Sequence, residues 1–531
     1  MDSSTTTLTS HSDVLSHDAL PFPQSCPEQL EALAFLFGVR SPPPAGARVL
    51  ELGCGAGANL IPFAARHPQA HAVGVDLSPA RLKEGAGVIA RARLMNIDLR
   101  AMDLADIDAS FGQFDYIICH GLYSRVQPAM QEAILRVCAQ NLAPDGVACV
   151  SYNVHPGWKA RETVRDAMRL RGAPRDDPDE KLSYARGMLE FLAQAARPGS
   201  VLRATLDEAL PAVRGASDAQ LLHEWLAPSN APCYFKQFVE RADAHGLAYL
   251  ADAEPHTMFA QNYSERVREP LMRQCGASQI LMEQTLDFLV NRASRQTLLV
   301  RRERAGEIRY RLEFERLRAL AYAGRFAADD GGVLALDGGE LSCTGLREQK
   351  LTLRLPIHRA VAQVLDERFP ATVEVDALAA EVSARIGEAR AVVDPLVLAM
   401  LEELVILGAV RIRRTAPQVA AHVSPFPQAP AALRNAREVA LSAGPAAAAS
   451  NQWHEQVALS PLERLLLPLL DGRHAHEDLA GHLVAEAQAG RLRLIGKDDK
   501  PLAGDEALRE FARQQVGFAL RDLRRKALLT G

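Results

Sequence analysis

The sequence predicts an α/β protein in which a parallel sheet wrapped by helices is followed by a helical region and two small helical modules. Three observations predict this arrangement. Short apolar runs alternate with helical spacing in the first third of the chain, helical spacing dominates the middle, and one layout of three helices occurs twice in the last third. With 531 residues, the chain exceeds what one hydrophobic core organises, so several domains are expected.

The first unit is predicted at residues 46–165, after a lead-in and capping segment at residues 1–45. Five apolar runs in it each end near a polar residue or a glycine, a rhythm typical of parallel strands joined by helices. The runs are RVLEL (48–52), AHAVGVD (70–76), DLRAMD (98–103), FDYIICH (114–120) and GVACVSY (146–152).

The later units are predicted from changes in periodicity. Helical spacing follows the first unit, with strand candidates only at LAYLADAE (247–254) and QTLLVRR (296–302). Three helical patterns closed by an edge strand are typical of a winged-helix-like module, and a similar layout returns near the end of the chain. We therefore predict a helical domain at 166–305, a first winged-helix-like module at 306–415, an Ala/Pro-rich linker at 416–452 and a second module at 453–531.

Composition excludes several classes of function. No apolar run approaches the roughly 20 residues that span a bilayer, and the N-terminus lacks the pattern of a secretion signal, so we expect a cytoplasmic protein without membrane partners. The eight cysteines form no CxxC pair, which gives no support to a metal site or a disulfide framework. A net charge of −5 with interspersed acids and bases does not favour a nucleic-acid partner. The oligomeric state is not indicated.

The most informative stretch is RVLELGCGAGANLIP, residues 48–62, in which a strand runs into a glycine loop and then a helix. Gly53, Gly55 and Gly57 let the backbone approach a ligand closely. Asp76 ends the next strand, where a carboxylate can accept hydrogen bonds from a ribose diol. These features predict a nucleoside cofactor.

Two further acids favour S-adenosyl-L-methionine as this cofactor. Glu51, two residues before the first glycine, suits the cationic ammonium group of that molecule and suits a pyrophosphate poorly. Asp103 follows the third strand, where it can meet the exocyclic amine of the adenine. Dinucleotide sites more usually carry GxGxxG, so a dinucleotide and a bare structural turn remain as alternatives.

The chain resembles the bacterial class I methyltransferases that carry a methyltransferase regulatory domain, a group that includes rickettsial protein lysine methyltransferases of outer-membrane proteins. The stretches that carry the resemblance are PFPQSCPEQLEALAFLFGV, RVLELGCGAGANLIPFA, GVDLS, FDYIICHGLYS, LAPDGVACVSYNVHPGWKARETVRDAM, LLHEWLAPSNAPCYFKQFVERADAHGLAYLADAE and TLDFLVNRASRQTLLVRRE. The resemblance implies a Rossmann-like sheet, methyl transfer from S-adenosyl-L-methionine and a protein substrate. Where the family pattern has Ser-Trp-Val-Pro, this chain has SRVQP at 124–128, which puts the identity of the methyl acceptor in question.

Candidate residues of the reaction follow the last strands of the predicted sheet, because ligands of open α/β sheets bind at the carboxyl ends of the strands. His120, Tyr152 and Asn153 are the catalytic candidates, and His120 is also a candidate for the adenine edge. The substrate-binding candidates are Tyr123, Trp158, Trp225 and Tyr234. For each, ordinary packing or a satisfied backbone turn is the alternative.

Three hypotheses of function follow. The first is a methyltransferase that acts on protein lysine, since a lysine amine that has lost its proton needs little beyond positioning for in-line attack on a sulfonium. The second keeps the fold with a small-molecule acceptor. The third is a cofactor sensor without catalysis, whose winged-helix-like tail binds a partner or DNA.

Overall fold

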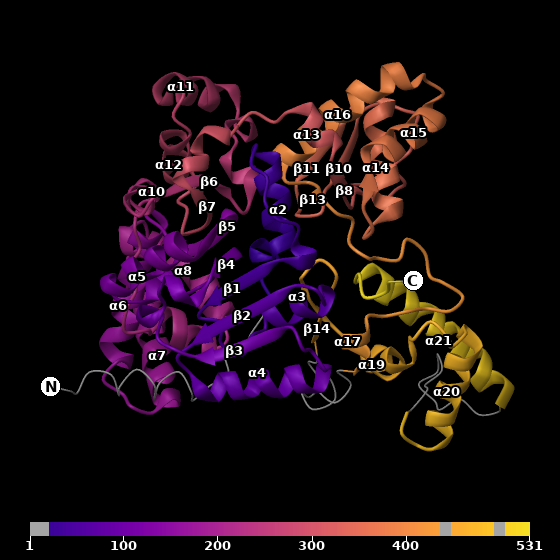
Figure 1. Ribbon diagram of the computed structural model, residues 1–531, viewed down its shortest axis with the longest axis horizontal. Coiled ribbons are helices and arrows are strands. Elements are labelled where there is room, and N and C mark those ends of the chain that lie inside the picture. The colour runs from indigo at the N-terminus through magenta and orange to yellow at the C-terminus, as the bar shows by residue number, and fades with distance from the viewer. Residues whose placement is uncertain (1–20, 436–447, 493–504, 531) are drawn as a thin grey trace.

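A seven-stranded sheet forms the centre of the computed structural model, which describes residues 21–435, 448–492 and 505–530 (Figure 1). The strand order is β3-β2-β1-β4-β5-β7-β6. Strands β1 to β5 run parallel, and β7 is antiparallel to both β5 and β6. The strands are β1 (Arg48–Leu52), β2 (His71–Asp76), β3 (Ile97–Ala101), β4 (Phe114–Cys119), β5 (Leu142–Asn153), β6 (Leu247–Asp252) and β7 (Ser294–Arg301).

The five predicted parallel strands are all present. In β1 every residue after Arg48 is buried, and the strand pairs with β2 on one side and β4 on the other, as expected of a central strand covered on both faces. The helices between and before these strands are α2 (Pro27–Leu36), α3 (Leu60–Arg66), α4 (Pro79–Ala92) and α5 (Pro128–Asn141). Parallel pairing brings the carboxyl ends of β1, β2 and β4 to one edge of the sheet.

The structure differs from the predicted separate domain at 166–305. Both strand candidates of that region, β6 and β7, extend the central sheet, where β7 pairs with β5. Antiparallel pairing across about 140 intervening residues leaves no local signal, so the sequence pattern could not assign these strands to the sheet. The helices of this region are α6 (Gly157–Gly172), α7 (Pro178–Ala195), α8 (Val201–Gly215), α9 (Asp218–Gln220), α10 (Phe235–Ala244), α11 (Glu265–Cys275) and α12 (Gln279–Leu289).

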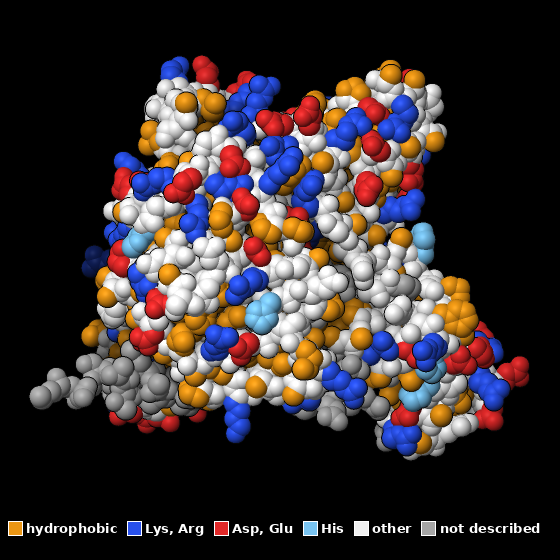
Figure 2. Space-filling model, in the orientation of Figure 1, with side chains coloured by type: hydrophobic (Ala, Val, Ile, Leu, Met, Phe, Trp, Pro, Cys, Tyr) orange, Lys and Arg blue, Asp and Glu red, His pale blue; other side chains and the backbone are white. Residues whose placement is uncertain are grey.

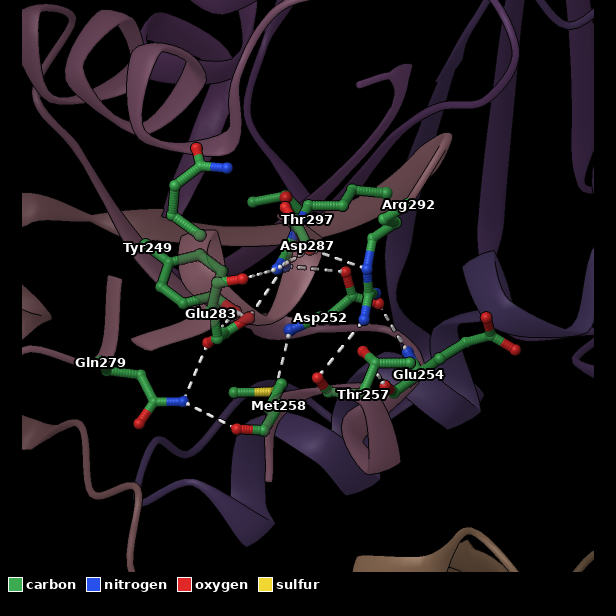
Figure 3. A network of polar contacts seen from close by, with 12 residues as sticks. Tyr249, Asp252, Glu254, Thr257, Met258, Gln279, Glu283, Asp287, Arg292 and Thr297 are labelled. Carbon is green, nitrogen blue, oxygen red and sulfur yellow. Dashed lines mark hydrogen bonds and ion pairs between the residues drawn. The ribbon is translucent and has the colours of Figure 1, made fainter. Parts of the chain in front are cut away.

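Buried ion pairs fasten α12 to the sheet (Figure 3). Arg295 of β7 is fully buried and donates to Asp287 at 2.8 and 2.9 Å and to Glu283 at 2.8 Å, both on α12. A third carboxylate, Asp252 of β6, lies 3.3 Å from the same guanidinium. Burial raises the pKa of Asp252 to about 6, although Arg295 opposes this shift.

A first winged-helix-like module follows the sheet. It consists of α14 (Pro356–Arg368), α15 (Val375–Ile386) and α16 (Arg390–Leu407), with a small sheet in the order β12-β8-β13. Its strands are β8 (Ala321–Ala323), β12 (Val373–Glu374) and β13 (Arg411–Arg413), preceded by α13 (Phe314–Arg318). A second small sheet, in the order β11-β10-β9, lies before α14 and contains β9 (Ala327–Ala328), β10 (Leu341–Thr344) and β11 (Lys350–Leu353). One hydrophobic core runs from the central sheet through α2 into this module.

The C-terminal module begins earlier than the predicted residue 453. Ala429 is fully buried and its N–H donates to the carbonyl of Leu470, so part of the predicted linker at 416–452 belongs to the module. Its Ala/Pro composition concealed this packing. The elements are α17 (Ala431–Asn435), the hairpin β14 (Ala448–Ser450) and β15 (Gln456–Ala458), α19 (Pro461–Leu466), α20 (His476–Gln488) and α21 (Asp505–Arg525). Residues 436–447 of the predicted linker and 1–20 of the lead-in lie outside the described residues.

Other general features limit the possible sites. Across the described ranges, no helix is both long and apolar enough to span a bilayer. All eight cysteines are buried and unpaired. In that same part of the chain, no group of three or more His, Cys, Asp or Glu side chains could hold a metal ion. Acidic and basic side chains are interspersed over the face shown in Figure 2.

Candidate active site

The glycine loop joins β1 to α3 at the carboxyl edge of the sheet. Gly53, Gly55 and Gly57 all adopt left-handed backbone conformations, with φ of 77°, 55° and 75°. Asp76, at the end of β2, fixes the loop: its Oδ2 accepts from the N–H of Gly55 at 2.8 Å, and its Oδ1 accepts from the N–H of Ser78 at 2.9 Å. Each carboxylate oxygen keeps a further lone pair, so Asp76 can hold the loop and a ribose diol together.

The loop is packed more tightly on the side of Gly85 than at Gly55. A Cβ added at Gly55 would have Arg81 Cδ as its nearest neighbour outside residues 54–56, at 3.9 Å, which is ordinary contact distance. A Cβ added at Gly85 of α4 would lie only 2.4 Å from the carbonyl oxygen of Ala56. Helix α4 therefore packs tightly against the loop at Gly85, whereas at Gly55 it contributes only the side chain of Arg81.

Glu51 is a buried carboxylate with one oxygen to spare. Its Oε1 accepts from Asn59 Nδ2 at 3.1 Å, and its Oε2 is buried with no hydrogen-bond partner in the described part of the chain. Burial raises the pKa of Glu51 to about 8; the hydrogen bond from Asn59 opposes this shift and the charge of Asp76 adds to it. A cation placed at Oε2 would satisfy the orphaned oxygen and stabilise the ionised form.

Asp103 and His120 follow β3 and β4. Asp103 Oδ1 accepts from the N–H of Ala105 at 2.9 Å, which leaves its other oxygen for an amine. The ring of Phe22 stacks on His120 with the ring centroids 3.6 Å apart. His120 Nδ1 is buried and has no partner among the described residues. Burial, and then the charge of Arg125, lower the pKa of His120 to about 4, so the ring is neutral at pH 7.

These residues fit S-adenosyl-L-methionine. The orphaned oxygen of Glu51 matches an ammonium group, Asp76 matches a ribose diol, and Asp103 and His120 have free positions for an adenine. Next to Gly55 the nearest side chain beyond its chain neighbours is that of Arg81, at ordinary contact distance, so no tight contact fills the position where the ligand would lie. A pyrophosphate fits poorly, because it would meet a buried carboxylate in place of helix N–H groups.

The structure separates the acceptor candidates Tyr152 and Asn153. Tyr152 lies in the core: its ring stacks on Phe238 at 3.9 Å, its hydroxyl lies 3.0 Å from Thr297 Oγ1, and burial raises its pKa well above the usual range. These contacts account for the position of Tyr152 as that of a packed core residue. Asn153 is half-buried and its Nδ2 donates to Asn230 Oδ1 at 2.8 Å, so its side chain faces the region after β5.

Three of the four substrate-binding candidates pack inside the protein. Tyr123, Trp158 and Trp225 are 0%, 5% and 4% exposed, and the two tryptophan rings lie 5.9 Å apart. Tyr234 is half-buried, with its ring 5.6 Å from that of Phe288, which is 54% exposed. Of the four, Tyr234 has the side chain best placed to meet a large substrate.

The SRVQP stretch contacts the region between β5 and β6 through two of its side chains. Arg125 pairs with Glu224 at 3.1 Å, and Gln127 Nε2 donates to Ser229 Oγ at 2.7 Å. Glu224 lies in the π-helical turn η6 (Leu221–Trp225). Arg125 and Gln127, which depart from the family pattern, therefore join the end of β4 to residues 224–229 between β5 and β6.

Sequence reasoning missed three residues that surround the site. Asn59 holds Glu51, Phe22 covers His120, and His454 of the C-terminal hairpin binds Asn59 at 2.7 Å. The position of Asn59, two residues after the last glycine, could have drawn attention to it. No local signal could place His454, because 395 residues separate it from Asn59.

Three family models match separate parts of the chain. They are described as "Methyltransferase domain" for residues 49–146, "Predicted methyltransferase regulatory domain" for residues 217–301, and "PKMT, C-terminal winged helix domain" for residues 428–528. Together they correspond to the central sheet, the region that closes it, and the C-terminal module.

Two uncharacterised proteins of Rickettsia prowazekii are among the relatives. RP789 is 37% identical over 288 residues, which cover 54% of this chain and 52% of RP789, so the match spans about half the length of that relative. RP028 is 36% identical over 234 residues, which cover 43% of this chain and 94% of RP028. The solved structure of PKMT2 from Rickettsia typhi matches with a TM-score of 0.86 at 28% identity, over 97% of this chain and all of that chain. Its complex with AdoHcy matches with a TM-score of 0.84 over the same shares.

The sheet order, the glycine loop with its acids and the matched domains agree with one another. The chain therefore belongs to the bacterial class I S-adenosyl-L-methionine-dependent methyltransferases that carry a methyltransferase regulatory domain.

Proposed function

We propose that this enzyme transfers methyl groups from S-adenosyl-L-methionine to lysine side chains of a protein. One observation carries the proposal: the likeness to PKMT2 of Rickettsia typhi extends over nearly the whole chain, and the tail matches the winged helix domain named for PKMT. A likeness confined to the sheet would support methyl transfer in general. The shared regulatory region and tail support a shared class of acceptor.

The bound cofactor supplies an electrophilic methyl group. When the cofactor is bound, Glu51 would pair with its ammonium group, Asp76 would accept from its ribose hydroxyls, and Asp103 would accept from its adenine amine. These contacts fix the donor, so that an amine entering along the line of the sulfur–methyl bond needs orientation and desolvation above all.

Deprotonation of the lysine is the main requirement on the acceptor side, because the reference pKa of its ammonium is about 10.4. His120, with a pKa of about 4, is too weak a base to take this proton efficiently. We therefore assign His120 to the cofactor side and propose that an apolar approach past Tyr234 favours the neutral amine. Asn153 is the proposed hydrogen-bond acceptor for that amine.

Mass spectrometry of methylated proteins tests the proposal. The purified chain is incubated with isotopically labelled S-adenosyl-L-methionine and bacterial proteins, with surface and outer-membrane proteins tested first, as the resemblance implies. We expect labelled methyl-lysine with the parent chain and none with Gly55→Leu. Labelled small molecules without methyl-lysine would favour the small-molecule hypothesis, and cofactor binding without any labelled product would favour the sensor.

We also propose that the protein works in the cytoplasm. The supporting observation is that all eight cysteines are buried free thiols, which is typical of proteins kept in a reducing compartment. Fractionation of cells that express the tagged chain tests this proposal, with recovery in the soluble cytoplasmic fraction as the expected result.

A further inference from the structure

The tip of the hairpin β14–β15 inserts between the C-terminal module and the central sheet. Its five residues, 451–455, connect the two strands, and Trp453 and His454 within it are 2% and 1% exposed. Trp453 Nε1 donates to the carbonyl of Pro370 at 2.9 Å. Asn451 Oδ1 accepts from the N–H of Trp453 and of Glu455, both at 2.9 Å. The tip is thus fixed by the first winged-helix-like module and by its own turn.

The partners of His454 determine its protonation. Nδ1 lies 2.8 Å from Arg66 Nη2, and because a guanidinium only donates, Nδ1 must accept. Nε2 lies 2.7 Å from Asn59 Oδ1, so it carries the proton and donates. His454 is therefore a neutral imidazole that joins α3 to the loop before it.

The Asn59 side chain links His454 to the residues of the cofactor site, and its hydrogen-bond partners define which way its amide points. Its Oδ1 accepts from the backbone N–H of Phe22 at 3.0 Å as well as from His454. Its Nδ2 donates to Glu51 Oε1 at 3.1 Å and to Ser25 Oγ at 3.2 Å. Since a backbone N–H can only donate, the oxygen must face Phe22 and His454. All four hydrogen-bonding positions of the amide are used.

Through Asn59, His454 reaches both sides of the cofactor site. One branch leads to Glu51, whose other oxygen is orphaned, and the second leads to Phe22, whose ring stacks on His120. Glu51 and His120 are the residues whose buried free atoms fit the cofactor. His454 of the C-terminal module therefore supports Glu51 and Phe22 indirectly, through Asn59. Both belong to a site formed by the N-terminal part of the chain.

We propose that His454 is a positioning residue for the methyl donor: it fixes Asn59, and the cofactor site reaches full affinity only when the C-terminal hairpin is docked. This inference rests on the cofactor site of the proposed function and adds an allosteric route between the tail and that site. A change that lifts the hairpin, such as binding of a partner to the C-terminal module, would then lower cofactor affinity.

The backbone of His454 supports this assignment. Its φ of 63° lies in the left-handed region, which costs a non-glycine residue conformational free energy. Glycine or asparagine would serve a simple turn without that cost. The position instead holds a side chain long enough to reach Arg66 and Asn59 together.

The test compares three variants of the full chain. His454→Leu removes both hydrogen bonds, whereas His454→Gln keeps an amide that can donate to Asn59. His71→Leu is the matched control, because His71 is exposed at the start of β2, the opposite end of that strand from Asp76. The readouts are the dissociation constant for S-adenosylhomocysteine by calorimetry, and KM and kcat with a methyl-accepting substrate.

We expect His454→Leu to weaken S-adenosylhomocysteine binding about tenfold and to raise KM for the donor with kcat within about threefold. His454→Gln and His71→Leu should bind within about threefold of the parent. If His454→Leu does not fold, His454→Asn replaces it, since asparagine tolerates the left-handed backbone but is too short to span both partners.

Two outcomes separate the claims. Unchanged affinity in His454→Leu, or equal weakening in His454→Gln and His454→Leu, would overturn the positioning role and leave the proposed function intact. A parent chain that does not bind S-adenosylhomocysteine would instead overturn the proposed function itself.

Discussion

Individual residues of the site each combine a structural and a ligand-directed role. Asp76 holds the glycine loop through the N–H groups of Gly55 and Ser78 and keeps lone pairs for a diol. Glu51 is fixed by Asn59 and keeps one oxygen free. A ligand can bind such a loop with little reorganisation, because the protein has already ordered it.

A pH series tests the state of Glu51. Its pKa is about 8 in the folded chain and about 4.3 when unfolded, so the unfolded state loses the proton first. The contribution of Glu51 to stability is fully present below pH of about 4.3 and is lost as the pH rises through about 8. Glu51→Gln cannot ionise. In the absence of cofactor we therefore expect the Tm of the variant minus the Tm of the parent to increase from pH 5 to pH 8.5.

Differential scanning calorimetry of both proteins provides this comparison. The same variant should bind S-adenosylhomocysteine more weakly, since a neutral amide replaces the carboxylate that faces the ammonium group. A Tm difference that stays constant over the pH range would show that Glu51 is ionised in the folded chain.

The sequence predicted the cofactor residues better than the acceptor residues. Gly53, Gly55 and Gly57 and the acids after them lie close together in the chain or follow adjacent parallel strands, so local pattern and sheet geometry suffice. Tyr152 and Trp158 are large side chains near the same edge, and only the structure shows that their neighbours bury them. Side-chain burial depends on contacts between distant segments, which no local pattern contains.

At the scale of the elements, close contacts place α4 against the glycine loop and α12 against the central sheet. Helix α4 approaches the glycine loop so closely that Gly85 has no room for a Cβ beside the carbonyl of Ala56. Helix α12 is joined to β7 by Glu283 and Asp287, which both pair with Arg295; Figure 3 labels these two carboxylates.

A matched pair of glycine substitutions in α4 tests its packing. Gly85→Ala should destabilise the fold by about 1–3 kcal/mol and weaken S-adenosylhomocysteine binding, because the new methyl group forces the helix away from the loop. Gly87→Ala, two residues on, meets only the movable guanidinium of Arg91 at 3.4 Å and should stabilise the helix by about 0.5–1 kcal/mol. Urea titrations give both free energies of unfolding, and equal effects would contradict the close approach.

The buried ion pairs of α12 give a second prediction at this scale. Arg295→Met leaves Glu283, Asp287 and Asp252 buried without their shared partner, so we expect a loss of about 3–5 kcal/mol. Arg273→Met, which removes an exposed guanidinium 3.7 Å from Glu269, is the control and should cost less than about 1 kcal/mol. Denaturant unfolding measures both, and similar small losses would mean that water reaches the buried carboxylates.

In the whole molecule, the central sheet, the hydrophobic core and the surroundings of the cofactor site are each built from segments that are distant in sequence. The sheet needs β6 and β7 from beyond residue 240, the core continues through α2 into the first winged-helix-like module, and His454 reaches the cofactor side of the sheet. The fold class and the seven strands of the central sheet were predictable from periodicity. Their assembly was not, because pairing of β7 with β5 and docking of the C-terminal hairpin join residues more than 140 positions apart.

We infer that the methyl donor binds in the space beside Gly55 of the glycine loop, and calorimetry with S-adenosylhomocysteine is the decisive measurement. Gly55→Leu would place a side chain in that space, whereas Gly246→Leu has a similar left-handed backbone, with φ of 80°, and open surroundings away from the loop. We expect one binding site per chain in the parent and in Gly246→Leu, and affinity reduced by about 100-fold or more in Gly55→Leu. Equal affinity in all three proteins would contradict it.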